Sequence, residues 1–305
     1  MTRDATLFIT GASGFVGRQV LRRLDPARFR RILLLTRREI GLPTHLAESG
    51  AVEQIRGGLD RPERYAPRLD ESTVILHLAA RTGRAKPADY ARDNVEGTRT
   101  LVRSAEETGA AGLVNVSSIA AKFPEAAYYP YADSKRAAEK VVAEGRRPWV
   151  TVRPTMVLGT ESPIWKKLRQ LARGPIPVVP GNPSTRIQPI HVADLASVLV
   201  DLAETRAFES LVCELGGGDA VTIEEFVKRT HERLTGRRGI VMPVPIALGV
   251  PLLRAFEKLS PAPLPLTEGQ LSTFLYDGTV DPNPLQARYA GRLRGVDDIL
   301  EALTS

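Results

Sequence analysis

The sequence predicts an α/β fold, in which a doubly wound parallel sheet is followed by a smaller C-terminal part. Short apolar runs alternate with stretches of helical periodicity as far as residue 154, and this alternation is typical of strands joined by crossover helices. A glycine-rich turn stands between the first apolar run and the first helical stretch. After Pro154 the pattern changes, because prolines gather between residues 163 and 183.

The predicted strands are short and apolar, as expected for strands that are buried on both faces. We expect strands at residues 6–10, 31–36, 52–57, 73–80, 112–118, 149–154 and 211–217. Apolar residues at helical spacing predict helices at 16–24, 94–109, 131–145, 191–204, 222–236 and 294–303. Gly109 and Gly145 are expected to end two helices, and Thr222 to cap another with Glu225 at the capping-box position.

The proline-rich segment 156–186 is predicted to consist mainly of loops. Residues 242–265 mix proline with apolar residues, which predicts a short helix at about 246–259 between proline loops. Its apolar side chains suit a protein core best. A substrate pocket, a dimer face and a membrane contact are the alternatives.

Composition narrows the class of protein. The chain has 305 residues, a net charge of +7 and a single cysteine, Cys213, which we interpret as a buried structural thiol. The basic residues are dispersed, which argues against a nucleic-acid-binding tail. The sequence contains no uncharged apolar run of about 18 residues and enters a strand near Thr6, so neither a transmembrane span nor a signal peptide is predicted. The four histidines are too scattered for a metal cluster, and we expect a cytoplasmic protein without metal.

The turn Gly11-Ala-Ser-Gly14-Phe-Val-Gly17 has the features of a phosphate-binding loop. Gly11 permits a tight exit from the strand, and Gly14 lets backbone amides approach a pyrophosphate. Gly17 lets the helix pack close to the sheet, with its N-terminus toward the phosphate charge. A strand before the turn and a helix after it provide the required context, so we predict a dinucleotide cofactor. The alternative is a purely structural turn.

The end of the second strand indicates which dinucleotide is bound. An NAD site has an acidic residue there for the ribose 2′-hydroxyl. This chain has Thr36-Arg37-Arg38 instead, and two guanidinium groups suit a 2′-phosphate. We therefore predict NADP(H). The alternative is that both arginines are only solvated charges at a strand end.

Seven motifs occur in the order of one known family. They are TGASGFVG (10–17), HLAA (77–80), NVEGT (94–98), VSS (116–118), YADSK (131–135), VRP (152–154) and IQPIHVADLA (187–196). Together they resemble the extended short-chain dehydrogenases/reductases, related to nucleotide-sugar epimerases, and this resemblance implies a Rossmann fold. The C-terminal segments ELGGGDAVTIEEFVKRTHERLTGRR (214–238) and PLPLTEGQLSTFLYDG (263–278) resemble a bacterial subgroup similar to the NADPH-holding accessory subunit of respiratory complex I, which is thought to bind cofactor without turnover.

Tyr131 and Lys135 form a YxxxK pair, and four residues on a helix place both side chains on one face. A lysine ammonium beside a phenol lowers the pKa of the phenol, which can then exchange a proton with a carbonyl or alcohol oxygen. The resemblance implies that Ser118, rather than Ser117, holds the same oxygen and that Asn94 lies near the cofactor. It also implies a set of cofactor contacts: Gly11, Ser13, Gly14, Phe15, Val16, Gly17, Thr36, Arg37, Arg38, Leu59, Leu78, Ala79, Ala80, Asn94, Val116, Tyr131, Lys135, Arg153 and Pro154.

The sequence also departs from the family pattern. Gly58 replaces the aspartate of a GDL motif that meets the adenine, and Asp60 follows two residues later. Ile119-Ala120 stands where the sugar dehydratases of the family have an acid pair, which disfavours dehydration.

We therefore predict an NADP(H)-dependent oxidoreductase that interconverts a carbonyl and a secondary alcohol of a small-molecule substrate. Residues 1–155, with 187–217 returning to them, would form the Rossmann domain, and 156–186 and 218–305 a small substrate-binding cap. A non-catalytic NADPH-binding scaffold or sensor and a sugar-nucleotide epimerase remain alternatives. No nucleic-acid partner is expected, while a homodimer and a peripheral membrane contact stay open.

Overall fold

The computed structural model describes residues 4–124, 129–244 and 276–305, so the helix predicted at about 246–259 lies outside the described residues. The chain divides into two compact units. Unit 1 comprises Met1–Ala121, Asp133–Arg153 and Val192–Cys213. Unit 2 comprises Lys122–Ala132, Pro154–His191 and Glu214–Ser305.

A seven-stranded sheet organises unit 1 and confirms the predicted fold class. Its strands are β1 (Thr6–Thr10), β2 (Arg31–Thr36), β3 (Val52–Arg56), β4 (Thr73–His77), β5 (Gly112–Val116), β6 (Trp149–Pro154) and β11 (Leu211–Leu215). The strand order is β11-β6-β5-β4-β1-β2-β3, and the pairs from β3 across to β6 are parallel. Thr10 at the end of β1 is in register with Leu35 of β2 and His77 of β4. The carboxyl ends of these three strands therefore share one edge.

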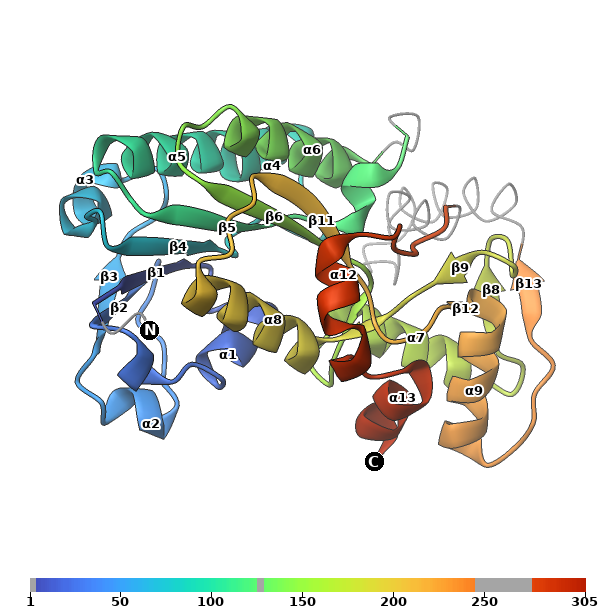
Figure 1. The fold of residues 1–305 in the computed structure, drawn as a ribbon. Coiled ribbons are helices and arrows are strands. Elements are labelled where there is room, and N and C mark those ends of the chain that lie inside the picture. Colours follow the sequence, from blue (N-terminus) through green and yellow to red (C-terminus); the bar gives the residue numbers. More distant parts are fainter. Residues whose placement is uncertain (1–3, 125–128, 245–275) are drawn as a thin grey trace. The chain divides into compact units, whose positions relative to one another are not determined.

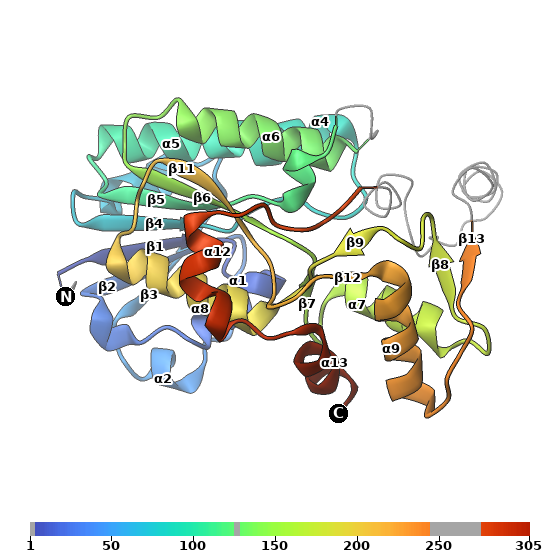
Figure 2. The ribbon, with the colours of Figure 1, turned by 45° about the vertical axis from the view of Figure 1, so that its right-hand side comes forward.

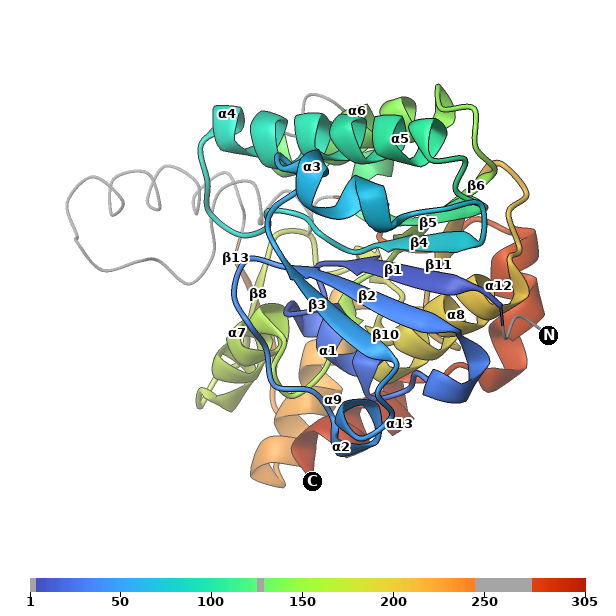
Figure 3. The same ribbon diagram turned by 90° about the vertical axis from the view of Figure 1, so that its left-hand side faces the viewer.

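Helices cover both faces of this sheet (Figures 1 and 3). One face carries α3 (Pro62–Tyr65), α5 (Gly97–Glu107) and α6 (Pro130–Ala143), and the other carries α1 (Phe15–Leu21), α2 (Thr44–Ala47) and α8 (Val192–Thr205). Three 3-10 turns, η1 (Pro26–Arg28), η2 (Ala66–Arg68) and η4 (Ile119–Lys122), connect the elements. Phe8 stacks on Tyr65 and packs with Leu33, Leu101 and Leu113 in one buried cluster. Burial of these apolar side chains holds the first helical layer on the sheet.

The region before α5 differs from the prediction. Helix α4 (Pro87–Tyr90) continues into a π-helical segment, η3 (Ala91–Glu96), which leads directly into α5. The predicted helix start at residue 94 is therefore wrong by about two turns. At the other end the prediction holds, because Gly109 follows α5 with a φ of 72°, in the left-handed region expected of a C-terminal glycine.

Unit 2 is built from short strands and helices around its own core. It contains β7 (Val157–Leu158), α7 (Pro163–Arg173), β8 (Val178–Pro180), β9 (Arg186–Ile187), β10 (Ile190–His191), β12 (Val221–Thr222), α9 (Ile223–Thr235), β13 (Met242–Val244), α12 (Pro284–Tyr289), η6 (Ala290–Arg292) and α13 (Val296–Thr304). β13 pairs in parallel with β8 (Figure 2). The helix α7 stands where loops were predicted. Ser162 caps it by accepting the Trp165 amide, and Pro163 occupies its first turn, where no amide donor is needed.

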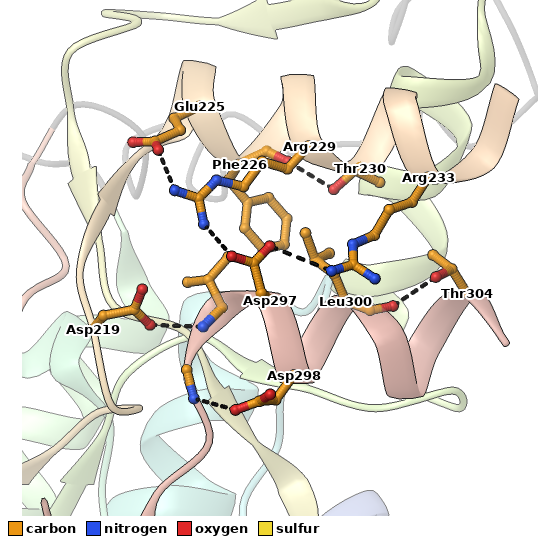
Figure 4. A network of polar contacts seen from close by, with 12 residues as sticks. Asp219, Glu225, Phe226, Arg229, Thr230, Arg233, Asp297, Asp298, Leu300 and Thr304 are labelled. Carbon is orange, nitrogen blue, oxygen red and sulfur yellow. Dashed lines mark hydrogen bonds and ion pairs between the residues drawn. The ribbon is translucent and has the colours of Figure 1, made fainter. Parts of the chain in front are cut away.

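Charged side chains connect α9 to α13 within unit 2 (Figure 4). Arg229 of α9 bridges Glu225 of its own helix and Asp297 of α13, the latter over 2.9 Å. Arg233 reaches the other oxygen of Asp297 over 3.4 Å. Beneath this network, Phe226 and Leu300 are fully buried. Because the ion pairs are partly exposed, the apolar contact contributes more to this packing than the charges do.

Candidate active site

The turn between β1 and α1 carries the glycines of the predicted cofactor motif. Gly11 has a φ of 76°, a conformation that residues with a Cβ rarely adopt. A Cβ at Gly11 would stand 2.6 Å from the amide nitrogen of Ala79, and one at Gly17 would stand 2.6 Å from the carbonyl oxygen of Ala12. These two glycines therefore let the turn lie directly against the exit of β4 and against α1.

A groove of about 700 Å³ opens next to this turn, within unit 1. It lies at the carboxyl ends of β1, β2, β3 and β4. β1 and β4 are neighbours in the sheet although two strands separate them in sequence, so the groove lies at the topological switch point, where open α/β sheets bind ligands. Its lining consists of Thr10, Gly11, Ser13, Gly14, Leu35, Thr36, Arg37, Gly57, Gly58, Leu59, Asp60, Leu78, Ala79, Ala80, Arg81, Thr82, Arg92, Asp93, Glu96, Gly97 and Thr100.

Many of the predicted cofactor residues meet in this groove. They come from the glycine turn, the end of β2, the loop after β3 and the exit of β4: Gly11, Ser13, Gly14, Thr36, Arg37, Leu59, Leu78, Ala79 and Ala80. Sequence reasoning selected them from four separate segments of the chain. The fold brings these segments to one edge of the sheet.

Other predicted residues lie outside the groove lining. Phe15, Val16 and Gly17 form the first turn of α1, Arg38 follows Arg37, Asn94 lies in η3, Val116 ends β5, Lys135 lies on α6 and Arg153 on β6. Tyr131 and Pro154 belong to unit 2. Of the predicted site residues, the structure therefore brings together mainly those that line the groove.

A second set of lining residues was not assigned to the site, although Gly58 and Asp60 were singled out as a departure from the family pattern. Gly57, Gly58, Asp60, Arg81 and Thr82 follow β3 and β4, while Arg92, Asp93, Glu96, Gly97 and Thr100 come from η3 and α5. The first group could have been found from its position directly after two strands. The second group depends on how η3 packs. The NVEGT motif (94–98) includes Glu96 and Gly97, but only Asn94 was assigned to the cofactor.

The β2 edge of the groove carries a polar atom without a partner. Thr36 is buried, and its Oγ1 has no hydrogen-bond partner among the described residues, although buried hydroxyl groups are normally paired. Arg37, next in sequence, is exposed and also lines the groove. A hydroxyl and a guanidinium therefore lie at the edge of the groove where the sequence predicts the ribose of a dinucleotide.

The carboxylate of Asp60 lies close to Gly58, which replaces the aspartate of the family motif. A Cβ placed on Gly58 would collide with the Oδ1 atom of Asp60. The carboxylate of Asp60 therefore folds back over Gly58, into the space that a side chain at position 58 would fill. The groove keeps a carboxylate near this point.

His77 links β4 to its neighbours through two hydroxyl groups. Its Nδ1 lies 2.7 Å from the Oγ1 of Thr10, and its Nε2 lies 3.0 Å from the Oγ1 of Thr98. Because Thr98 donates its hydroxyl proton to the carbonyl of Asn94, it accepts from Nε2, which carries the ring proton. Thr10 then donates its hydroxyl proton to Nδ1, and its Oγ1 can accept a hydrogen bond from the backbone amide of Ala79. Burial, followed by the charge of Lys135, lowers the pKa of His77 to about 3, so the ring is neutral.

Asn94 does not line the groove, but it holds a residue that does. Its Oδ1 accepts the amide of Arg81 over 2.7 Å, and its Nδ2 donates to the carbonyl of Arg81 and to the hydroxyl of Ser134. Arg81 also pairs with Asp93 over 2.5 Å. Asn94 is buried and thus fixes the backbone at the exit of β4 relative to α6.

Helix α6 carries the YxxxK pair, with Tyr131 in its first turn and Lys135 in the next. Lys135 is buried, and its Nζ donates to the carbonyl of Val116 over 2.8 Å. Burial lowers the pKa of Lys135 to about 8, against an opposing effect of the nearby Glu139 carboxylate. The ring of Tyr131 lies 5.4 Å from that of Tyr129, measured between ring centroids.

The two serines after β5 differ in accessibility. Ser117 is buried, whereas Ser118 is partly exposed at the start of the η4 turn. The Oγ of Ser118 accepts the amide of Ala120 over 3.2 Å, and its carbonyl accepts the amide of Ala121. The Oγ of Ser117 has no hydrogen-bond partner among the described residues, and the choice of Ser118 over Ser117 stays a prediction.

Arg153 is occupied by a protein partner. Its Nε and an Nη bind the two carboxylate oxygens of Glu139 on α6, over 2.9 and 2.6 Å. Such a two-pronged arrangement is among the stronger ion pairs in proteins. The predicted cofactor contact of Arg153 therefore concerns a side chain that is already bound to α6.

A doubly wound parallel sheet with a groove at its switch point defines the class of nucleotide-binding α/β proteins. Within this class, the chain belongs to the NAD dependent epimerase/dehydratase family, which it matches over residues 7–212, and thus to the extended short-chain dehydrogenases/reductases.

Two curated relatives cover most of the chain. A protein of Caulobacter vibrioides named ceramide reductase is 32% identical over 210 residues, which are 67% of this chain and 63% of the relative. The mitochondrial NADH dehydrogenase [ubiquinone] 1 alpha subcomplex subunit 9 of Dictyostelium discoideum is 24% identical over 226 residues, 73% of this chain and 62% of the relative. The chain thus spans less than two thirds of the length of either protein.

Among solved structures, MoeE5 in complex with UDP-glucose and NAD has the same fold. The TM-score is 0.71 at 22% sequence identity, and the comparison covers 98% of this chain and 97% of MoeE5. In the part of the chain that the structure describes, no helix is both long and apolar enough to cross a membrane. Within the same residues, no group of three or more His, Cys, Asp or Glu side chains could hold a metal ion.

Proposed function

We propose that the chain is an NADP(H)-dependent oxidoreductase that interconverts a carbonyl and a secondary alcohol of a small molecule. One observation carries the proposal. Lys135 is a buried ammonium on α6, one helical turn after Tyr131, and its hydrogen bond goes to a backbone carbonyl rather than to a carboxylate. Burial of a charged group costs free energy. In the family, the lysine of this pair activates the phenol of the tyrosine one helical turn before it.

The side chains divide the chemistry between them. Tyr131 gives a proton to the substrate oxygen during reduction and takes it back during oxidation. The Lys135 ammonium stabilises the phenolate that Tyr131 then becomes, and the Ser118 hydroxyl holds the same oxygen. A bound nicotinamide supplies or accepts the hydride. Reduction is the favoured direction, since NADPH is normally kept reduced in the cytoplasm.

The groove residues support a dinucleotide and favour the phosphorylated form. The glycine turn offers backbone amides to the pyrophosphate, and the Thr36 hydroxyl and Arg37 guanidinium suit a 2′-phosphate. Residues 156–186 and 218–305 would form the cap that holds the substrate.

The direct test is NADPH oxidation by the purified protein with a panel of ketones, aldehydes and sugar nucleotides. The panel should contain a long-chain keto lipid, because one relative is named ceramide reductase. The variant Tyr131→Phe should reduce turnover by about 10³-fold or more, since the proton donor is lost, while NADPH binding stays within about threefold. Unchanged turnover in this variant would refute the proposed role of Tyr131.

A second candidate is an NADPH-binding scaffold, because the match to the respiratory complex subunit extends over 73% of the chain. The same panel separates the two. Tight NADPH binding without turnover of any compound would favour the scaffold. An epimerase is less well supported, because known members mostly have an acidic residue after the second strand, where this chain has Thr36-Arg37-Arg38.

A further inference from the structure

Glu139 continues the row of functional side chains along α6. It lies one turn after Lys135 and two turns after Tyr131, so the three side chains share one helix face. Its carboxylate is bound through both oxygens by Arg153 of β6, over 2.9 and 2.6 Å. Glu139 is only 6% exposed, so this is a buried ion pair.

Stability alone does not explain such a pair. Removal of two charges from water costs about as much as their attraction returns, and apolar replacements of a buried pair are often at least as stable. The charge closest in sequence on the same helix face is the Lys135 ammonium, whose hydrogen-bond acceptor among the described residues is the Val116 carbonyl. Glu139 is therefore placed to act on Lys135.

We propose that Glu139, held in place by Arg153, is a positioning residue that keeps the Lys135 ammonium charged next to Tyr131. The inference rests on the proposed function, because the charge on Lys135 matters for catalysis only if Tyr131 exchanges protons. Arg153 binds both carboxylate oxygens of Glu139, and the hydrogen-bond acceptor of Lys135 among the described residues is the neutral Val116 carbonyl.

Among the described residues, the other titratable groups near Lys135 on β4, α6 and β6 do not supply this negative charge. His77, which faces it from β4, is neutral, because its pKa lies at about 3. On α6 itself, Tyr131 is the group to be activated, and Asp133 is paired with Arg136 over 3.0 Å. From β6, Arg153 brings a positive charge that is engaged by Glu139.

The direction of the effect follows from the two influences on Lys135. Burial lowers the pKa of Lys135 to about 8, and the Glu139 carboxylate opposes this shift. Without the carboxylate the pKa falls further, so a larger fraction of Lys135 is neutral near physiological pH. The phenol of Tyr131 then loses its cationic neighbour, and its own pKa rises.

The test measures the titration of Lys135 directly, in the whole protein labelled with ¹³C at lysine Cε. In Glu139→Gln we expect the pKa of Lys135 to fall by about one unit, a tenfold change in the protonation equilibrium. In the pH–rate profile of alcohol oxidation, the acid limb should move to higher pH by a similar amount. Glu106→Gln is the matched control, since Glu106 is also paired with an arginine, Arg146, but lies on α5. This control should leave Lys135 unchanged.

A second variant protects the test against misfolding. Glu139→Met combined with Arg153→Met removes both charges and leaves no unpaired ion in the core. It should lower the pKa of Lys135 in the same direction. If the titration is unchanged in folded Glu139→Gln and in the double variant, the inference is overturned, even for an active enzyme. If the protein turns over no substrate, the titration still shows whether Glu139 affects the pKa of Lys135. Failure of the proposed function is therefore a separate outcome.

Discussion

The proposed preference for NADP(H) rests on one side chain more than on any other. Arg37 lines the groove at the end of β2, whereas Arg38 does not. Both were predicted to bind the 2′-phosphate, but the structure places only Arg37 at the edge of the groove. We therefore expect Arg37→Ala to weaken NADPH binding and Arg38→Ala to have little effect.

The size of the effect follows from the exposure of Arg37. A hydrogen bond to a charged group contributes about 1.5–3 kcal/mol. Because Arg37 is exposed at the groove edge, solvent and salt screen it, and the lower half of this range applies. A loss of about 1.5–2 kcal/mol corresponds to roughly 10- to 30-fold weaker binding. NADH, which lacks the 2′-phosphate, should bind to Arg37→Ala and to the unaltered protein with affinities within about threefold.

Titration calorimetry with NADPH and NADH measures both affinities without any need for a substrate. Arg38→Ala is the matched control, since it removes the same charge one residue further on. Added salt should reduce the difference between the two dinucleotides, as expected for an exposed charge pair. Equal losses for NADPH and NADH in Arg37→Ala would refute the assignment, because the side chain would then serve a part that both dinucleotides share.

Two further predictions concern the neutral histidine and the exposed serine. Between pH 6.5 and about 3 an unfolded imidazole binds a proton while folded His77 does not, so the free energy of unfolding falls as pH decreases. His77→Gln should reduce this slope by up to about 1.4 kcal/mol per pH unit in urea unfolding series, and an unchanged slope would contradict the neutral ring. Ser118→Ala should lower turnover by about 10²-fold, whereas Ser117→Ala should lower it by less than about threefold, which steady-state NADPH oxidation measures. Equal effects would contradict the choice of Ser118.

The sheet could be predicted because its strands carry their own signal. β1, β2 and β4 are buried along almost their whole length, and such continuous apolar runs favour parallel strands regardless of what surrounds them. The glycine turn was equally predictable, since the φ of 76° at Gly11 and the close approach to Ala79 demand a residue without a Cβ.

Other elements could not be predicted, because their cause lies elsewhere in the chain. The helix α7 was not predicted, because its segment is rich in prolines, which usually break helices. Pro163 stands in the one turn where a proline costs nothing, and Trp165 and Leu168 bury the face that stabilises the helix. The groove residues of η3 were missed for a similar reason, since only the packed structure brings this segment to the exit of β4.

Asn94 makes contacts within the protein that its motif does not indicate. The sequence predicted that it lies near the cofactor, but its side chain is fully used within the protein: it binds the Arg81 backbone on one side and Ser134 on the other. Ser134 immediately precedes Lys135, and Arg81 lines the groove. A single buried amide therefore ties the wall of the groove to the helix that carries the proposed proton donor. Asn94 lies within the π-helical segment η3, whose spacing departs from the 3.6-residue period, so helical periodicity alone does not indicate where this helix begins.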